Sequence, residues 1–291
     1  MNTSMQKYSI FISGATSGLG LGVAEHFAKL GYTLIFCARN EDTVSRVENH
    51  LKSISSKSQI ILGFKCDVSD SVEVSKMFDE LKIHGIVIDV LICNAGVIGP
   101  IDKFLETEQS EWQKAFDINL YGTISLIAEV LPWMVSQNKG RVIHISGGGA
   151  TSPLFGMSSY AASKAAAVRF IETLAMEYVD SGVTFNSIAP GMLKTQLLDQ
   201  MLQAGPERIG GKLFTRSSVK ANSATDSSEQ AIRLIDFLTS DASSGITGKL
   251  ISAEWDNWTE WPDHLAELMS SDLYTLRRIT GRDRDQNWGD L

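Results

Sequence analysis

A tyrosine and a lysine stand four residues apart, as Tyr160 and Lys164 in the run SSYAASK at residues 158–164, which opens a strong helical pattern. Residues at this spacing share one face of a helix. A free phenol has a pKa of about 10, and a nearby ammonium group favours the ionised form and lowers that pKa. The pair therefore predicts a general acid and base that exchanges a proton with a substrate oxygen. Taken alone, the same spacing more often marks a pair on the protein surface.

A glycine-rich segment, SGATSGLG at residues 13–20, lies between the first apolar run and a helical pattern. Glycines in such a turn let the backbone approach a pyrophosphate, and the following helix N-terminus supplies amide donors and a positive dipole end. A plain structural turn is the alternative, but the place between the first strand and helix favours a dinucleotide site. The residues expected to bind the cofactor here are Ser13, Gly14, Thr16, Ser17, Gly18, Leu19 and Gly20.

The end of the second apolar run, CARN at residues 37–40, indicates which dinucleotide binds. An acidic residue at this place binds the ribose 2′-hydroxyl of NAD. Ala38 has no such group, whereas Arg39 can form a charge-assisted contact with the 2′-phosphate of NADP. Glu41 and Asp42 follow closely and would weaken phosphate binding. NADP(H) is therefore the expected cofactor, with NAD(H) and a merely solvated arginine as the alternatives.

Polar and small residues also follow the third and fourth apolar runs. Parallel sheets bind ligands beyond the carboxyl ends of their strands, so these positions are expected beside the cofactor. Asp67 can reach the adenine amino group; the alternative is a helix cap near Ser69. The cofactor-binding residues expected at these two strand ends are Asp67, Val68, Asn94, Ala95 and Gly96.

Short apolar runs alternate with amphipathic helical patterns along most of the chain. This alternation predicts an α/β fold with one doubly wound parallel sheet and helices on both faces. Gly31 and Gly182 are expected just after the ends of the first helix and of a helix over 159–180. The predicted strands are Tyr8–Ser13, Thr33–Ala38, Ile60–Cys66, Ile88–Cys93, Arg141–Ser146, Val183–Ala189 and Lys249–Ala253.

With these features together, the chain resembles the short-chain dehydrogenase/reductase family over about residues 8–253. The resemblance implies a single Rossmann-like domain and an NADP(H)-dependent oxidoreductase that interconverts a carbonyl and a secondary alcohol by hydride transfer, acting as a reductase and without a metal. Five motifs carry it in order: SGxxxGxG at 13–20, CNAG at 93–96, DINL at 117–120, YxxxK at 160–164 and PGMLKT at 190–195.

The resemblance also implies roles for single residues. Tyr160 exchanges the proton, Lys164 holds the nicotinamide ribose and lowers the tyrosine pKa, and Asn119 holds a water that relays protons. Both Tyr160 and Lys164 thus count as catalytic and cofactor-binding residues. The nicotinamide carboxamide is expected to lie against Pro190, Gly191 and Thr195.

The serine that polarises the substrate carbonyl in this family departs from its usual pattern. Members commonly carry two serines after the fifth strand, and the second one binds the substrate oxygen. Here the run is ISGGGA at 145–150, so Gly147 stands in the usual serine column and Ser146 is the one serine left. Three consecutive glycines allow the loop to shift, so Ser146 is the expected catalytic serine. The alternative is a buried strand-end serine bonded to the backbone.

Two regions fit the alternation of strands and helices less well. Residues 192–228 are rich in Gly, Ser, Thr and Lys and predict a long loop with short helices, of the kind that forms a substrate lid. Residues 254–291 form a C-terminal helical extension, in which a stripe of leucines and one methionine predicts a helix that starts near Pro262 and ends near Gly281. This extension either packs on its own domain or lines a substrate or subunit site with one of its tryptophans, Trp255, Trp258, Trp261 and Trp288.

Composition bounds the partners of the protein. The net charge of −8 and the absence of a Lys/Arg-rich run argue against nucleic acid, and we expect no membrane partner because no apolar stretch reaches the ~18 residues of a span. Three cysteines after separate apolar runs predict reduced, buried thiols and a cytoplasmic protein.

The expected partners are therefore a small-molecule carbonyl or alcohol and other copies of the chain. Small residues on the helix after Tyr160 predict a homodimer or homotetramer. A non-catalytic NADP-sensing protein on the same fold is the alternative function.

Overall fold

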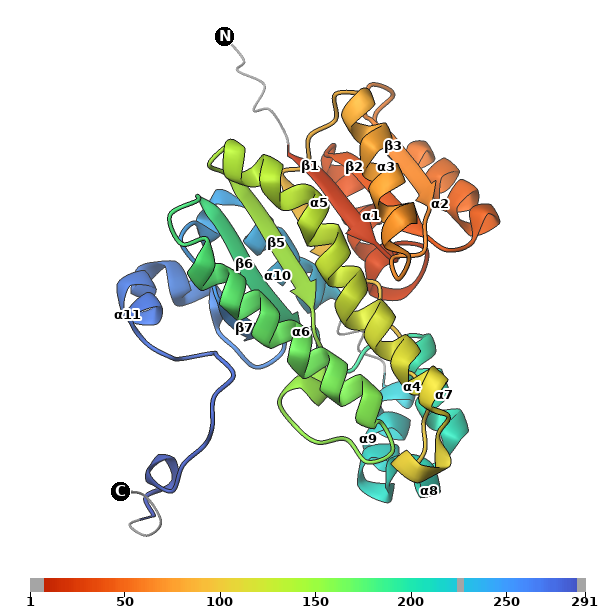
Figure 1. Cartoon of the computed structure of the whole chain (residues 1–291), viewed down its shortest axis with the longest axis vertical. Coiled ribbons are helices and arrows are strands. Elements are labelled where there is room, and N and C mark those ends of the chain that lie inside the picture. Colours follow the sequence, from red (N-terminus) through yellow and green to blue (C-terminus); the bar gives the residue numbers. More distant parts are fainter. Residues whose placement is uncertain (1–7, 224–227, 287–291) are drawn as a thin grey trace.

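The computed structural model describes residues 8–223 and 228–286 of the 291-residue chain. Seven strands form one sheet, and every neighbouring pair is parallel (Figure 1). The predicted strands are all present, with ends that differ by at most two residues. They are β1 (Ser9–Ser13), β2 (Thr33–Ala38), β3 (Ile61–Lys65), β4 (Val90–Cys93), β5 (Gly140–Ile145), β6 (Val183–Ala189) and β7 (Lys249–Ser252).

The strand order is β3-β2-β1-β4-β5-β6-β7, which confirms the doubly wound Rossmann-like α/β fold. Connections run outward in both directions from the β1/β4 pair, and folds of this kind bind ligands at that switch point, beyond the strand carboxyl ends.

Helices cover both faces of the sheet (Figure 1). Successive residues of β1 show why: Ile10 and Ile12 enter the apolar cluster on one face, whereas Phe11 enters the cluster on the other. A strand buried on both sides reads as a continuous apolar run, as predicted. One face carries α1 (Gly18–Leu30), α2 (Glu41–Ile54) and α10 (Ser228–Thr239), and the other carries α3 (Ser71–Ile83), α5 (Gly122–Ser136) and α6 (Ser158–Glu177).

Local sequence sets the ends of several helices. Gly31 ends α1 in the left-handed conformation, as predicted, with φ 84°. The Asn40 side chain accepts a hydrogen bond from Thr43 N and so caps α2. The expectation for the longest helix was wrong by three residues, because α6 ends at Glu177. Gly182, with φ 68°, lies in the turn that follows rather than directly after the helix.

One continuous helical run, Gln109–Ser136, is long and apolar enough to cross a membrane by length and composition alone, since an 18-residue window within it has a mean hydropathy of 1.4. The expectation that no stretch reaches this length was therefore wrong. The run comprises α4 (Gln109–Phe116), a π-helix over Asp117–Tyr121, and α5. Its hydropathy has a structural cause, because Leu126, Ile127 and Val130 of α5 are buried against the sheet.

The region predicted as a long loop with short helices has that form. It folds as α7 (Gln196–Ala204), α8 (Pro206–Ile209) and α9 (Gly211–Asn222), which lie beside α4 beyond the carboxyl ends of the strands (Figure 1). Residues 224–227 of this region lie outside the described residues.

The C-terminal extension folds differently from the prediction. Its leucine stripe does not form one helix: a 3₁₀-helix over Trp258–His264 leads into a short helix, α11 (Leu265–Ser270). The ammonium of Lys249 donates to the carbonyl of Leu268 within α11 and to those of Ser271 and Leu273 just beyond it, where the chain leaves the helix. The remaining short 3₁₀-helices are Phe104–Glu106, Gly148–Ala150, Asp241–Ser243 and Arg282–Arg284.

Candidate active site

A cavity of about 2400 Å³ opens beyond the carboxyl ends of the strands. Its lining includes residues at or directly after the ends of β1, β2, β4, β5 and β6, the start of α1, and parts of α6, α7 and α9. Small-molecule pockets usually measure about 300–1,000 Å³. The cavity therefore has room for a dinucleotide and a substrate together.

The glycine-rich turn forms one end of this cavity. Gly14 and Gly18 have φ 68° and 54°, in the left-handed region that favours glycine. A Cβ at Gly20 would lie 2.4 Å from the carbonyl oxygen of Gly14, so only glycine lets α1 approach the turn this closely. Five of the predicted residues line the cavity: Gly14, Thr16, Ser17, Gly18 and Leu19.

Ser13 and Gly20 shape the glycine-rich turn without lining the cavity. The Ser13 hydroxyl accepts hydrogen bonds from the main-chain N–H groups of Asn94 and Ala95, at 3.0 and 3.1 Å. The Asn94 side chain donates in return to the carbonyls of Ser13 and Gly14. The predicted residues after β1 and after β4 are thus tied into one unit, and Asn94, Ala95 and Gly96 all line the cavity.

The ends of β2 and β3 form the next part of the wall. Arg39 is exposed at the cavity, and Arg46 of α2 lines the same region. Arg46 was not among the residues predicted to bind the cofactor. Helical spacing from the Asn40 cap nevertheless places Arg46 one turn after Thr43, and Thr43 also lines the cavity. Neither arginine forms an ion pair within 8–223 and 228–286, so two positive groups face this end of the cavity.

Asp67 and Val68, both predicted to bind the cofactor, line the cavity after β3. The Asp67 carboxylate accepts hydrogen bonds from Ser69 N and Ser69 Oγ, at 3.0 and 2.6 Å. The cap of α3 is Asp70 rather than Asp67. One carboxylate oxygen of Asp67 therefore has these local partners, and the residue still faces the cavity.

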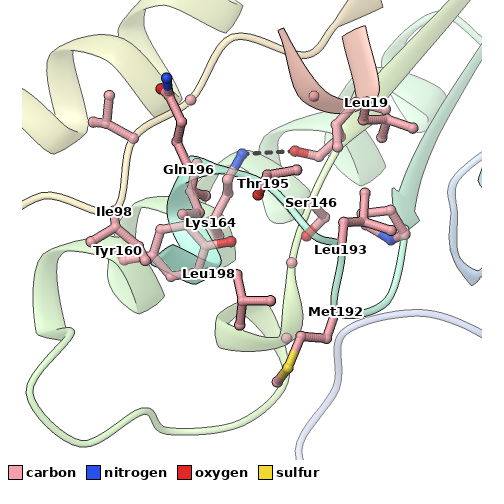
Figure 2. A pocket seen from close by; sticks show the side chains of 18 of the residues that line it. Leu19, Ile98, Ser146, Tyr160, Lys164, Met192, Leu193, Thr195, Gln196 and Leu198 are labelled. Atoms are coloured by element: carbon pink, nitrogen blue, oxygen red, sulfur yellow. Dashed lines mark hydrogen bonds between the residues drawn. The ribbon is translucent and has the colours of Figure 1, made fainter. Parts of the chain in front are cut away.

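Tyr160 and Lys164 lie on one face of α6 and both line the cavity (Figure 2). Lys164 Nζ donates to the Ile145 carbonyl at 2.7 Å, at the end of β5. Burial lowers the pKa of Lys164 to about 8 and raises the pKa of Tyr160 to about 12. The expected lowering of the tyrosine pKa by the lysine is not seen in this structure, where burial raises it.

Asn119 lies in the π-helix between α4 and α5 and is fully buried. Its side-chain oxygen accepts from Val97 N at 2.8 Å, and its amide donates to the Val97 carbonyl and to Ser163 Oγ. Single π-turns inside helices are frequent at functional sites. A Cβ at Gly96 would lie 3.2 Å from Asn119 Oδ1 and 3.3 Å from Lys164 Nζ, so the predicted asparagine and lysine approach each other behind the cavity wall.

Ser146 lines the cavity, and its buried hydroxyl has no hydrogen-bond partner in the described part of the chain. Its main-chain N–H is bonded to the Ile188 carbonyl, so the strand end holds the residue in place. A buried polar atom without a partner is rare and points to a missing ligand or water. The alternative of a hydroxyl tied to the backbone does not hold.

Steric contact explains why position 147, next to Ser146, is a glycine. A Cβ at Gly147 would lie 2.2 Å from the Tyr160 hydroxyl, closer than real atoms approach. The tyrosine hydroxyl therefore occupies the space that a serine side chain would need at position 147.

Residues after β6 close the cavity over the glycine-rich turn. Pro190, Gly191 and Thr195, the residues predicted to lie against the nicotinamide carboxamide, all line it. A Cβ at Gly18 would lie 3.1 Å from Thr195 Cγ2, so Thr195 stands directly across from the start of α1. Gly191 has φ 85°, and a Cβ there would lie 2.9 Å from Glu254 Oε2, which brings the C-terminal extension to this wall.

Comparisons with known proteins agree with this geometry. The chain matches the short chain dehydrogenase family over residues 9–205. It is 30% identical over 254 residues to a diacetyl reductase that forms (S)-acetoin, from Staphylococcus epidermidis, with 85% of this chain and 96% of that protein covered.

Solved structures show the same fold. L-sorbose reductase from Gluconobacter frateurii, complexed with NADPH and L-sorbose, has a TM-score of 0.74 at 25% identity and covers 87% of this chain and 97% of its own. A xylitol dehydrogenase with bound NAD⁺ has a TM-score of 0.74 at 22% identity, with 86% and 98% covered. We conclude that the chain belongs to the short-chain dehydrogenase/reductase family of oxidoreductases.

Proposed function

We propose that this protein is an NADP(H)-dependent reductase that interconverts a carbonyl and a secondary alcohol. The observation that carries the proposal is one cavity that contains the Tyr160 hydroxyl, the unpartnered Ser146 hydroxyl and the glycine-rich turn. Proton exchange and oxygen binding require the first two groups, and dinucleotide binding requires the third.

The residues present fit a dinucleotide. The narrow approach at Gly20 and the start of α1 suit a pyrophosphate, whose charge the helix N-terminus stabilises. Arg39 and Arg46 suit the 2′-phosphate of NADP, because charge-assisted hydrogen bonds to phosphate are strong. The bound nicotinamide supplies or accepts the hydride; all other steps fall to the protein.

The protein positions and moves the proton. Ser146 Oγ donates to the substrate oxygen and polarises the carbonyl. Tyr160, whose phenol is protonated at neutral pH, then gives its proton to that oxygen. Lys164 and Asn119, which lie close together behind Gly96, hold the ribose and a relaying water in this proposal.

Binding and turnover of the reduced cofactors test this function. Isothermal titration should give a lower Kd for NADPH than for NADH, and Arg39→Ala should remove most of that preference. A screen of ketones with NADPH, followed at the nicotinamide absorbance, should show turnover. Equal affinities for the two cofactors would contradict the NADP assignment. Tight NADPH binding without turnover of any ketone would favour the NADP-sensing alternative.

We also propose a cytoplasmic homodimer or homotetramer. All three cysteines are buried free thiols, which suits a reducing compartment. Large apolar side chains are exposed on α6 and on the π-helix before α5, among them Met176 (79% exposed) and Tyr121 (56% exposed). Light scattering at micromolar concentrations should give at least twice the mass of the chain, and a monomer would contradict the proposal.

A further inference from the structure

Part of the cavity wall comes from the C-terminal extension, far in sequence from the proposed catalytic residues. Two separate segments reach it: residues 254–256, which follow β7 directly, and Tyr274 with Thr275, about twenty positions later. The chain between them runs outside the sheet (blue in Figure 1) and returns. Something must therefore hold the returning segment at the cavity.

The first anchor is Lys249 on β7. Its side chain is buried, and Nζ donates to the carbonyls of Leu268, Ser271 and Leu273 at 2.8, 3.2 and 3.0 Å. A buried ammonium is costly unless it is fully hydrogen-bonded, and here all three of its protons have partners. Next to it, the Tyr274 carbonyl accepts a hydrogen bond from Leu250 N at 2.7 Å, so the extension pairs with the outer edge of β7.

The second anchor lies on α6, the helix that carries Tyr160. Glu172 Oε1 accepts a hydrogen bond from Leu276 N at 2.7 Å, and its other oxygen lies 2.7 Å from Arg169 Nη1. Arg169 also donates to the Leu276 carbonyl. The extension is thus fixed on both sides of Tyr274, to β7 and to α6.

The tryptophans of the extension differ in their exposure to solvent. Trp258 and Trp261 are buried, with ring centroids 5.2 Å from Phe237 and 4.3 Å from Tyr274. Trp255 is 78% exposed and lines the cavity. Trp288, the fourth, lies outside the described residues. Among the described tryptophans of the extension, Trp255 is therefore the one whose indole is available to a ligand.

Apolar side chains form part of the cavity around Tyr160. Ile98 and Leu198 are almost fully buried beside it, and Met192 lines the same space (Figure 2). Such a surface favours an apolar group next to the reacting carbon, since burial of apolar area drives binding. An aromatic indole farther along the same cavity would extend this preference.

We propose that the C-terminal extension is the specificity-determining wall of the pocket. Trp255 contacts the distal part of a ketone or secondary alcohol that bears an extended apolar or aromatic substituent. Lys249 and Glu172 are positioning residues that hold the wall in place. The inference rests on the proposed function for its substrate class, and on the geometry of the extension for the contact itself.

Steady-state kinetics with two ketones test the contact. Benzylacetone reaches beyond the reacting carbon, whereas acetone does not. Trp255→Ala should raise KM for benzylacetone about tenfold and leave kcat, the KM for acetone and NADPH affinity unchanged. Trp255→Phe should restore part of the loss. Met269→Ala removes a half-exposed apolar side chain of the extension that does not line the cavity, and it should change none of these values.

The anchors are tested in the same assay. Lys249→Met should raise KM for benzylacetone and spare the kcat for acetone, because the wall moves while the catalytic groups stay. If that variant does not fold, Arg169→Ala removes an exposed partner of the anchor on α6 and should show a smaller rise. An equal KM rise for both ketones, or no rise for benzylacetone in Trp255→Ala, would overturn the proposal.

Calorimetry separates this inference from the proposed function. Benzylacetone is titrated into the protein saturated with NADP⁺, where no reduction takes place. Weaker binding to Trp255→Ala than to the unchanged protein and to Met269→Ala supports the proposed contact of Trp255 with the ketone. This holds even if no ketone is reduced and the proposed reductase function fails. Equal binding to all three proteins, or no binding to any of them, overturns it.

Discussion

The two walls of the cavity are built on different principles. The wall formed by the strand ends and the first turns of α1 and α6 consists of glycines at close approach and of buried polar groups such as Asn119 and Lys164. The wall formed by α7, α9 and the C-terminal extension presents exposed side chains such as Trp255 and Arg216. Catalytic groups must hold reacting atoms at fixed positions, and a rigid surrounding keeps them there. Side chains on an exposed surface can be replaced without disturbing the core. The difference suggests that the first wall determines the chemistry and the second determines the substrate.

The largest effect is expected when the acid is removed from the first wall, the rigid wall formed by the strand ends and the first helical turns. Tyr160→Phe removes one hydroxyl and keeps the ring, so we expect kcat to fall about 10³-fold, within the range for general acid–base groups. NADPH affinity should stay within about twofold, because the ring still fills its place. Stopped-flow turnover and isothermal titration measure both values. A variant with more than about a tenth of the original rate would mean that another group donates the proton.

The serine gives the next largest effect. Ser146→Ala removes a buried, unpartnered hydroxyl that lines the cavity together with Tyr160, and we expect a loss of about 10²-fold in kcat with little change in stability. Gly148→Ala is a matched control, since a Cβ there meets nothing within 4 Å. Full activity in Ser146→Ala would transfer the oxygen contact to a main-chain amide or a water.

Much of the rigid wall could be predicted from the sequence because its signals are local. Gly14, Gly18 and Gly20 fall in one turn, and Tyr160 and Lys164 fall on one helix. The steric reason for Gly147 could not be predicted, because it depends on where the Tyr160 hydroxyl lies in space.

The C-terminal wall was mispredicted for a related reason. Its apolar stripe suggested one long helix, but the chain turns where carbonyls bind Lys249 and where Leu276 binds Glu172, 104 positions away. Contacts over such separations leave no periodic pattern in the sequence. Helical spacing could have found Arg46, since the Asn40 cap fixes where α2 starts.

Burial of Lys164 gives the rigid wall a pH dependence. Its pKa is about 8 in the folded protein and about 10.5 when unfolded, so between these values the unfolded state binds more protons and stability rises with pH. We expect this residue to add about 2 kcal/mol to the free energy of unfolding between pH 7 and pH 9.5, from at most about 1.4 kcal/mol per pH unit.

The Lys164→Met variant lacks this titration. Its free energy of unfolding should exceed that of the unchanged protein by a margin that shrinks by about 2 kcal/mol between pH 7 and pH 9.5. Urea unfolding of both proteins at the two pH values measures the difference. A gap that stays constant would mean that Lys164 keeps an ordinary pKa in the folded protein.

The smallest expected effect lies at the rim of the cavity. Arg46 is exposed, and solvent screening limits exposed charge contacts to about 1 kcal/mol or less. Arg46→Ala should therefore weaken NADPH binding about fivefold and leave NADH binding unchanged, because only NADPH carries the 2′-phosphate. Lys76→Ala, an equal loss of charge on α3 away from the cavity, controls for the general field of the protein. Titrations at low and high salt should show the Arg46 effect shrinking as ionic strength rises. If Arg46→Ala weakens both cofactors equally, the residue supports the fold of this rim, and Arg39 alone remains as the candidate contact for the phosphate.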